Sequence, residues 1–503
     1  MSSDRIDPEF RALPLAALAD AALSRARELG AEHADLRVER IVSQSVDLRD
    51  GSVTGVADEA TVGLAVRVIV DGVWGFASHV ELTPARAAHT AERAVAVART
   101  LAPVAVERVE RAAEPVHADA VWVSAYAVDP FTVPTKAKVE LLTEWSQRLL
   151  AADGVDHTHV GVAQVRENKF YADLAGTSTI QQRVRVHPQF TATAVDRAAG
   201  GFETMRSLAA PAGRGWEYLT GDGFDWDAEL AVVPELLAEK TKVPSVEAGA
   251  YDLVIDPTNL WLTIHESVGH ATEYDRAIGY EAAYAGTSFA TPDQLGTLRY
   301  GSEHMHVTGD RTVPHGLATI GFDDDGVATT EWDLVRDGVL VGYQLDRTFA
   351  PRLGLDRSNG CAFADSPHHV PIQRMANVSL QPDPARDTST EELIAGVERG
   401  IYVVGDKSWS IDMQRYNFQF TGQRFYRIED GRLAGQLRDV AYQATTTDFW
   451  GSLDAVGGAS TWQLQGAMNC GKAQPGQIAA VSHGCPAARF RGVRVLNTQE
   501  EGH

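Results

Sequence analysis

Positive charge, cysteine and long apolar runs are all scarce in this chain of 503 residues. Lysine and arginine number 45 against 68 aspartates and glutamates, which gives a formal net charge of -23. A nucleic-acid partner needs a basic surface, so we expect none. No apolar run reaches the about 18 residues of a membrane span, and no membrane association is expected. The opening residues also lack the basic and apolar regions of a secretory signal.

The chain has three cysteines, Cys361, Cys470 and Cys485. A small, odd number in a long chain is typical of a reducing compartment. We therefore expect a cytoplasmic protein with free thiols. Cys361 and Cys485 are interpreted as buried small hydrophobic residues.

The length predicts two domains or more, because single cores stop growing near about 250–300 residues. Apolar residues recur at helical spacing around residues 15–36, 83–102, 134–152 and 228–242, with strand-like alternation between these segments. We place the boundary near Pro244. Residues 1–243 are predicted to form an α+β domain in which helices pack on antiparallel strands.

Residues 244–503 are predicted to be rich in strands. Asp-Gly pairs between alternating segments are strong hairpin signals. They occur at 50–51 and 71–72 in the first domain and at 325–326, 337–338 and 430–431 in the second. The second domain is therefore expected to be a mainly antiparallel sheet, rolled into a barrel. The acidic stretch 323–326 lacks the ligand spacing of an EF-hand and is interpreted as a hairpin turn.

One segment, "LTIHESVGHATEYD" (262–275), carries the clearest chemistry. Asp256 and Pro257 suit the start of a helix, and apolar residues follow at helical spacing. His265 and His270 lie five positions apart, or about 140° around a regular helix, so a straight helix could not present both to one ion. A π-bulge would bring them together, and Gly269 fits such a departure from α geometry. We predict a bulged or broken helix here.

Glu266 follows His265 directly, where metal hydrolases place a general base. A catalytic zinc usually has three protein ligands and an open position, so two histidines are not sufficient. Spacing alone leaves several third partners open. These are Glu273 or Asp275 as a ligand or orienting group, Cys470, or Cys485 with His483 beside it.

The chain resembles the TldD/PmbA family, specifically its TldD-like, metal-bearing branch. The resemblance rests on "HESVGHATEYD" (265–275), "SFA" (288–290), "TDFWGSL" (447–453), "TVGLAVRVIVDGVWGFAS" (61–78) and, above all, "GAMNCGKAQPGQIAAVSHGCPAARFRGVRV" (466–495). It covers nearly the whole chain in the right order.

The resemblance implies one zinc ion per chain, held by His265, His270 and Cys470, with Glu266 as general base. It implies a metallopeptidase that acts on unfolded proteins or peptides, as a homodimer or as a heterodimer with a PmbA-like partner. It also implies a C-terminal barrel-like domain that carries the metal-site helix. The physiological substrate, and the choice between endo- and exopeptidase, do not follow from it.

Two segments, 357–365 and 403–420, depart from the family pattern where substrate contacts are plausible. Within the second, Trp409, Tyr416, Phe418 and Phe420 either line a peptide groove or form an ordinary half-buried strand. Two rival functions stay open. One is a non-catalytic binding or scaffold protein stabilised by metal, and the other is a metal-dependent amidase acting on a small molecule.

Overall fold

Four long strands form the framework of the N-terminal half of the computed structural model, which describes residues 5–196 and 201–499. They are β1 (His33–Arg49), β2 (Ser52–Val70), β5 (His157–Asp173) and β6 (Ser178–Asp196). Shorter strands complete the sheet: β3 (Val73–His79), β4 (Ala120–Val123) and β7 (Gly201–Arg206). The order is β3-β2-β1-β5-β6-β4, with β7 also on β6, and only the β4–β6 pair is parallel.

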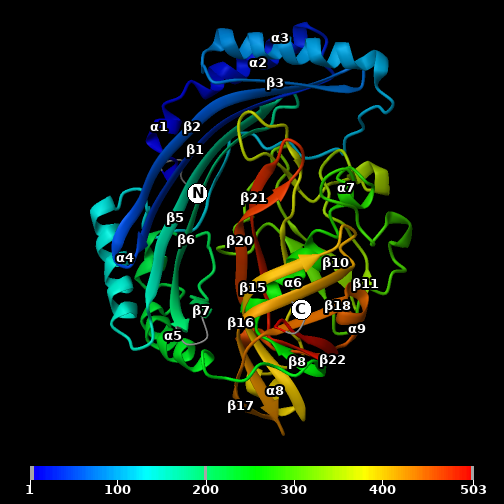
Figure 1. Cartoon of the computed structure of the whole chain (residues 1–503). Coiled ribbons are helices and arrows are strands. Elements are labelled where there is room, and N and C mark those ends of the chain that lie inside the picture. The colour runs from blue at the N-terminus through cyan, green and yellow to red at the C-terminus, as the bar shows by residue number, and fades with distance from the viewer. Residues whose placement is uncertain (1–4, 197–200, 500–503) are drawn as a thin grey trace.

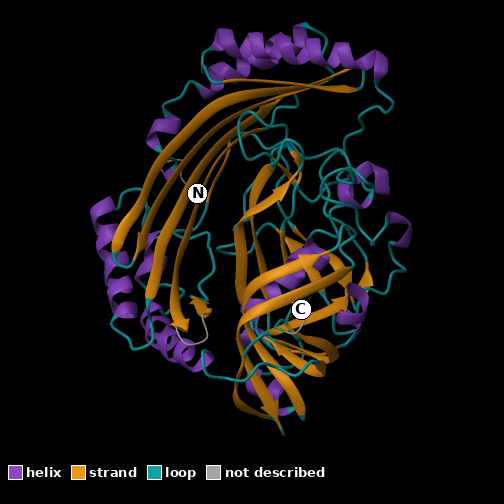
Figure 2. Ribbon diagram, in the orientation of Figure 1, coloured by secondary structure: helices purple, strands orange, loops and turns teal. Residues whose placement is uncertain are grey.

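Two pairs of helices cover one face of this curved sheet (Figures 1 and 2). Helices α2 (Leu15–Glu28) and α3 (Pro84–Leu101) pack near β1, β2 and β3. Helices α4 (Thr135–Leu150) and α5 (Trp226–Lys240) pack on the other end of the long strands, near β5 and β6. Short helical turns are α1 (Pro8–Arg11), Ala102–Val104 and Trp216–Thr220. This arrangement confirms the predicted helices packed on antiparallel strands.

The opposite face of the sheet carries charged side chains that are buried against the C-terminal half. Along β1, Leu36 and Val38 belong to the apolar cluster under the helices, whereas Arg37 on the other face donates to the Ser366 carbonyl at 2.9 Å. Lys169 on β5 contacts the Asp324 carboxylate at 2.9 Å. Burial of these charges is tolerated because each has an opposite partner, since Arg37 also pairs with the Asp324 carboxylate at 3.4 Å.

The acidic stretch 323–326 forms a turn closed by a bridge between Phe322 and Ala328, as predicted. Its carboxylates have a second role that the turn interpretation did not include. Asp324 is bound by Lys169, and Asp325 is paired with Arg67 of β2. The turn therefore connects the two halves of the chain through buried ion pairs.

A closed five-stranded barrel forms the centre of the C-terminal half. Its strands are β8 (Gly249–Ile255), β15 (Arg399–Ile411), β16 (Asn417–Glu429), β18 (Val440–Thr445) and β22 (Ala488–Asn497). The order is β15-β8-β22-β18-β16, and the β15–β16 pair closes the ring. The β15–β8 pair is parallel and the other pairs are antiparallel. The predicted barrel-like, mainly antiparallel domain is thus confirmed.

The remaining elements surround the barrel. A four-stranded sheet contains β9 (Val307–Asp310), β10 (Glu331–Arg336), β11 (Val339–Leu340) and β14 (Asn377–Leu380). Two-stranded units are β12 (Ala362–Phe363) with β13 (Ile372–Gln373), and β20 (Gln463–Lys472) with β21 (Gln477–Cys485). Strand β17 (Arg432–Leu437) pairs with β16, and β19 (Leu453–Val456) pairs with β22. Short helical segments are α7 (Tyr274–Ala277), α8 (Thr390–Ala395), α9 (Thr446–Gly451), Pro292–Gln294, Ala350–Leu353 and Ala459–Thr461.

The Asp-Gly pairs all lie in turns. At 50–51, 71–72, 337–338 and 430–431 both residues have positive φ, as a type I′ hairpin turn requires. At 325–326 only the glycine does. Between α5 and β8 the chain runs from helix to barrel, and the division at 243/244 stays a prediction. Among the residues described, no helix is long and apolar enough to cross a membrane.

Candidate metal centre

The helix that carries the two histidines is bulged at the predicted place. Helix α6 (Pro257–Ile264) is capped by Asp256, whose side chain accepts a hydrogen bond from the Thr258 amide. It continues into a π-helical turn, His265–Gly269, and the His270 amide donates to the His265 carbonyl, five residues back, at 3.0 Å. The widened turn brings the two imidazole centroids within 4.6 Å of each other. The prediction of a π-bulge is confirmed.

Gly269 ends the bulge at a position that admits no side chain as the residues stand. A Cβ atom there would lie 2.7 Å from the Met375 sulfur. Because glycine has no side chain, the backbone at the end of the π-helical turn can pass close to Met375.

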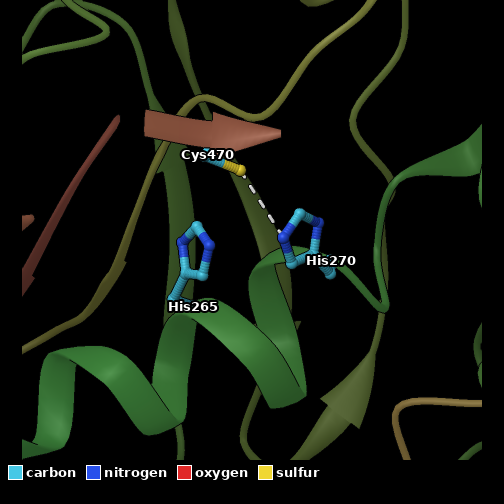
Figure 3. Close-up of side chains that lie close together, drawn as sticks. All are labelled: His265, His270 and Cys470. Atoms are coloured by element: carbon cyan, nitrogen blue, oxygen red, sulfur yellow. Dashed lines mark hydrogen bonds between the residues drawn. The ribbon is translucent and has the colours of Figure 1, made fainter. Parts of the chain in front are cut away.

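Cys470 of β20 completes a cluster of three potential ligands with His265 and His270 (Figure 3). Their ligand atoms lie within 4.8 Å of one another, and all three residues are buried. The Cys470 sulfur is 3.5 Å from His270 Nε2. Tetrahedral zinc with Zn–S of about 2.3 Å and Zn–N of about 2.0–2.1 Å separates sulfur and nitrogen ligands by about 3.6 Å. The distance between the Cys470 sulfur and His270 Nε2 therefore fits a shared zinc ion.

Hydrogen bonds fix which nitrogen of each histidine is available. His270 Nδ1 lies 2.8 Å from the Glu273 carboxylate, which only accepts, so Nδ1 carries the hydrogen. His483 Nδ1 likewise donates to the Val378 carbonyl at 2.8 Å. The unprotonated Nε2 of His483 then accepts a hydrogen bond from His265 Nδ1 at 2.7 Å. Both ligand histidines are left with a free Nε2 lone pair, as metal-binding histidines with oriented rings require.

The charge states of His265, His270 and Cys470 also suit a metal ion. Burial lowers the pKa of His265 and of His270, which favours neutral imidazoles. Burial opposes ionisation of the Cys470 thiol, but His270 and Arg374 outweigh it and lower the pKa of this group. His270 lowers the Cys470 pKa only while it holds a proton. A zinc ion bound between the two would displace that proton and leave two neutral nitrogens and a thiolate, a normal donor set for this metal.

Glu273 and Lys472 connect the bulged helix to the strand that bears Cys470. The Lys472 ammonium is fully buried and contacts Glu273 at 3.2 Å and Asp275 at 2.7 Å. Burial opposes ionisation of Glu273, but Lys472 and His270 hold the pKa of this carboxyl well below its usual range. Of the roles left open by the sequence, the geometry gives Glu273 that of orienting His270. Asp275 is a partner of Lys472.

Replacing Lys472 with methionine is expected to weaken zinc binding by about 10–100-fold, the usual effect of losing a group that orients a ligand. Glu273 would lose the ammonium group that it shares with Asp275. Its hydrogen bond to His270 Nδ1 would then hold the imidazole less firmly. Competition with a chelator measures the affinity. Lys138→Met is a matched control, since this lysine is also buried but lies on α4 and donates to Gln44. Equal zinc affinity in wild type and Lys472→Met would contradict the linkage.

Glu266 lies next to the cluster, in the wall of a cavity of about 600 Å³ that His265, His270 and Cys470 also line. Its carboxylate accepts a hydrogen bond from Arg415 Nη1 at 2.7 Å. The sequence did not identify this arginine, and no local pattern marks it. His483 was noted only as a neighbour of Cys485, and its contact with His265 was not foreseen.

The other predicted residues fall into two groups. Trp409 lines the cavity and is 55% exposed, in agreement with the groove interpretation. Phe418 and Phe420 belong to the barrel core, and Tyr416 packs against Phe289. Phe418 and Phe420 thus follow the alternative of an ordinary strand, whereas Tyr416 lies just before that strand begins.

The remaining cysteines take no part in the cluster. Cys361 and Cys485 are both fully buried, as interpreted. Burial raises the pKa of the Cys361 thiol to about 11, and the Cys485 sulfur faces the Pro257 carbonyl at 3.7 Å. In the part of the chain that the structure describes, His265, His270 and Cys470 form the one cluster with metal-ligand geometry.

Two family models match the chain. Residues 248–497 match the C-terminal domain of the PmbA/TldA metallopeptidases, and residues 34–98 match their domain 1. A metalloprotease of Methanothermobacter thermautotrophicus is 28% identical over 93% of this chain and 96% of its own length. A zinc metalloprotease TldD homolog of Saccharolobus solfataricus is 25% identical over 54% of this chain and 58% of its own length.

Solved structures share the fold at low sequence identity. TldE of Thermococcus kodakarensis has a TM-score of 0.69 at 15% identity and covers 95% of this chain and 99% of its own. A protein of Thermotoga maritima described as a putative modulator of a DNA gyrase has a TM-score of 0.74 at 16% identity, over 95% and 99% of the two chains. With both domain models matched in order along the chain and the fold shared throughout, the chain belongs to the TldD/PmbA family.

Proposed function

We propose that this chain is a zinc-dependent metallopeptidase of the TldD-like branch, which hydrolyses peptide bonds in unfolded proteins or peptides. One observation carries the proposal: a cluster of two histidines and a cysteine lines a cavity, with a glutamate beside it. Three protein ligands and an open side are typical of catalytic zinc, whereas structural zinc has four. Named relatives include metalloproteases and a zinc metalloprotease.

In this proposal His265, His270 and Cys470 hold one zinc ion per chain. When bound, zinc would lower the pKa of a water molecule towards neutrality and polarise the scissile carbonyl. Glu266 would accept a proton from the attacking water through the oxygen that Arg415 does not hold, and would pass it to the leaving amine. Glu273 and His483 would keep the two imidazoles oriented.

The shape of the cleft supports a peptide as the substrate. Residues 465–471, which belong to β20, line the metal cavity. Residues 462–465 line a second cavity of about 870 Å³, which shares Leu208, Ala210, Pro211 and Thr258 with the first. Among the described strands, β20 pairs only with β21. An extended peptide could therefore add to β20 along the cleft, bound through its backbone with little sequence preference.

We further propose that the protein works in the cytoplasm as a homodimer or with a PmbA-like partner. The three free, buried thiols are consistent with a reducing compartment.

The test combines metal analysis with a protease assay. We expect about one zinc per chain and cleavage of unfolded casein, by the chain alone or together with a PmbA-like protein. Dialysis against a chelator should abolish cleavage, and added zinc should restore it, because the ion both activates the attacking water and polarises the scissile carbonyl.

Two other outcomes would replace the proposal. Stoichiometric zinc without cleavage of any peptide, alone or with the partner, would indicate a metal-stabilised binding protein. Cleavage confined to small amides in a broad substrate panel would indicate an amidase.

A further inference from the structure

Arg415 lies in a tight turn between β15 and β16, inside the segment where the sequence departs from the family pattern. Its φ is +62°, in the left-handed region that a residue with a side chain seldom adopts. The Asp412 carboxylate accepts hydrogen bonds from the amides of Gln414 and Tyr416, at 3.0 and 2.8 Å. Thr446 donates to the Arg415 carbonyl at 2.8 Å. The surroundings thus hold Arg415 in an unfavourable conformation.

The same turn is also docked on the loop that follows the metal-site helix. The amides of Thr287 and Phe289 donate to the carbonyls of Met413 and Gln414, at 2.7 and 2.9 Å. Directly before Thr287, Gly286 has a φ of +85°, and a Cβ atom there would lie 2.0 Å from the Met413 carbonyl oxygen. Only glycine permits this close approach. The two hydrogen bonds and the close contact at Gly286 together fix the position of the turn relative to the loop.

The result is that the Arg415 side chain is aimed at Glu266. Its Nη1 donates to Glu266 Oε2 at 2.7 Å, and its Nη2 contacts the Ala285 carbonyl at 3.3 Å. The side chains of Arg415 and Glu266 are 14% and 7% exposed. Among the residues described, Arg415 is the hydrogen-bond partner of the Glu266 side chain, and it holds one carboxylate oxygen while leaving Oε1 free. Strained backbone that the surroundings maintain is a common sign of a functional constraint.

We propose that Arg415 is a positioning residue, which holds Glu266 in the one orientation that presents Oε1 to the proton it must take. This inference rests on the proposed function, because it assigns Glu266 the role of general base. A carboxylate on a flexible side chain samples several rotamers. Proton transfer requires it within hydrogen-bond distance of the reacting water. The ion pair selects the productive rotamer before substrate arrives.

Arg415→Met removes the donors and retains much of the apolar stem. We expect kcat for peptide cleavage to fall about 10–100-fold, since a misplacement of about 1 Å costs about 100-fold. KM should change by less than about twofold, because the substitution removes no contact that binds the substrate and the transition state equally. Zinc content should equal that of wild type. Arg415→Lys, which keeps one charged donor, should recover part of kcat. Gln414→Ala, an exposed neighbour in the same turn, should retain wild-type kcat.

A purely structural role and a role in substrate binding predict other results. If Arg415 only stabilises the turn, Arg415→Lys should not rescue kcat. If it binds substrate, a peptide should bind Glu266→Gln/Arg415→Met more weakly than Glu266→Gln at equilibrium, and we expect equal affinities. Unchanged kcat in Arg415→Met would overturn the proposal outright.

Thermal unfolding separates failure of this inference from failure of the proposed function. The two side chains interact directly, so the Tm changes of Glu266→Gln and Arg415→Met should not add in the double variant. Additive Tm changes would show that Arg415 and Glu266 do not form an ion pair, whether or not the protein cleaves peptides. A coupled pair in a protein that cleaves no peptide would instead overturn the assigned reaction and, with it, the positioning role.

Discussion

Glu266→Gln is expected to lower kcat for peptide cleavage by about 10²–10⁴-fold, the range that general acid–base groups contribute. The amide keeps the size of the side chain but cannot take a proton from water at neutral pH. Zinc should stay bound, because Glu266 is not among the three clustered ligands. Steady-state kinetics together with zinc analysis of the same preparation measure both effects.

The control for Glu266→Gln is Glu217→Gln in the N-terminal half. This carboxylate is also buried, and it accepts from the amides of Val128 and Gly215 far from the metal cluster. Its loss should lower stability and leave kcat per folded molecule unchanged. A zinc-loaded Glu266→Gln protein with full activity would contradict the mechanism.

The bulged helix was predictable because the relevant rule is local. A regular helix separates residues five apart by about 140° around its axis. Binding of one metal ion by both His265 and His270 therefore required a departure from α geometry. The Asp-Gly turns and the amphipathic helices were predictable for the same reason. In each case the information lies within a few consecutive residues.

The neighbours of the cluster were not predictable from such rules. His483 lies 218 residues from His265, and Arg415 lies 149 residues from Glu266. Their contacts exist only once the barrel has closed and β20–β21 has docked. Periodicity and turn chemistry contain no information on such pairs. Cys470 was assigned through the family resemblance, since spacing left Glu273, Asp275 and Cys485 open as well.

The inner face of the N-terminal sheet illustrates the same limit. Alternation along β1 predicted a strand, but it did not show that the charged side faces protein instead of water. Arg67 and Lys169 become buried because Asp325 and Asp324 of the other half meet them. A polar stripe on a strand usually indicates solvent, and only the tertiary contact distinguishes the two cases.

Cys470→Ala is expected to abolish activity and to weaken zinc binding by more than the about 10–100-fold that an orienting residue contributes. The thiolate supplies the charge that balances part of the ion, and two neutral histidines cannot replace it. Purified Cys470→Ala should therefore contain far less than one zinc per chain, by metal analysis after dialysis against a weak chelator.

The chain offers matched controls, because its other two cysteines are equally buried and lie outside the cluster. Cys361→Ala and Cys485→Ala should retain zinc at wild-type affinity, with at most a loss of stability from the small cavity left behind. Cobalt substitution gives a second readout: the thiolate-to-metal absorption should vanish in Cys470→Ala alone. Full zinc content in Cys470→Ala would remove this residue from the ligand set and reopen Glu273, which already lies beside His270, as the third ligand. The comparison thus tests the one ligand that the sequence pattern could not choose without the family resemblance.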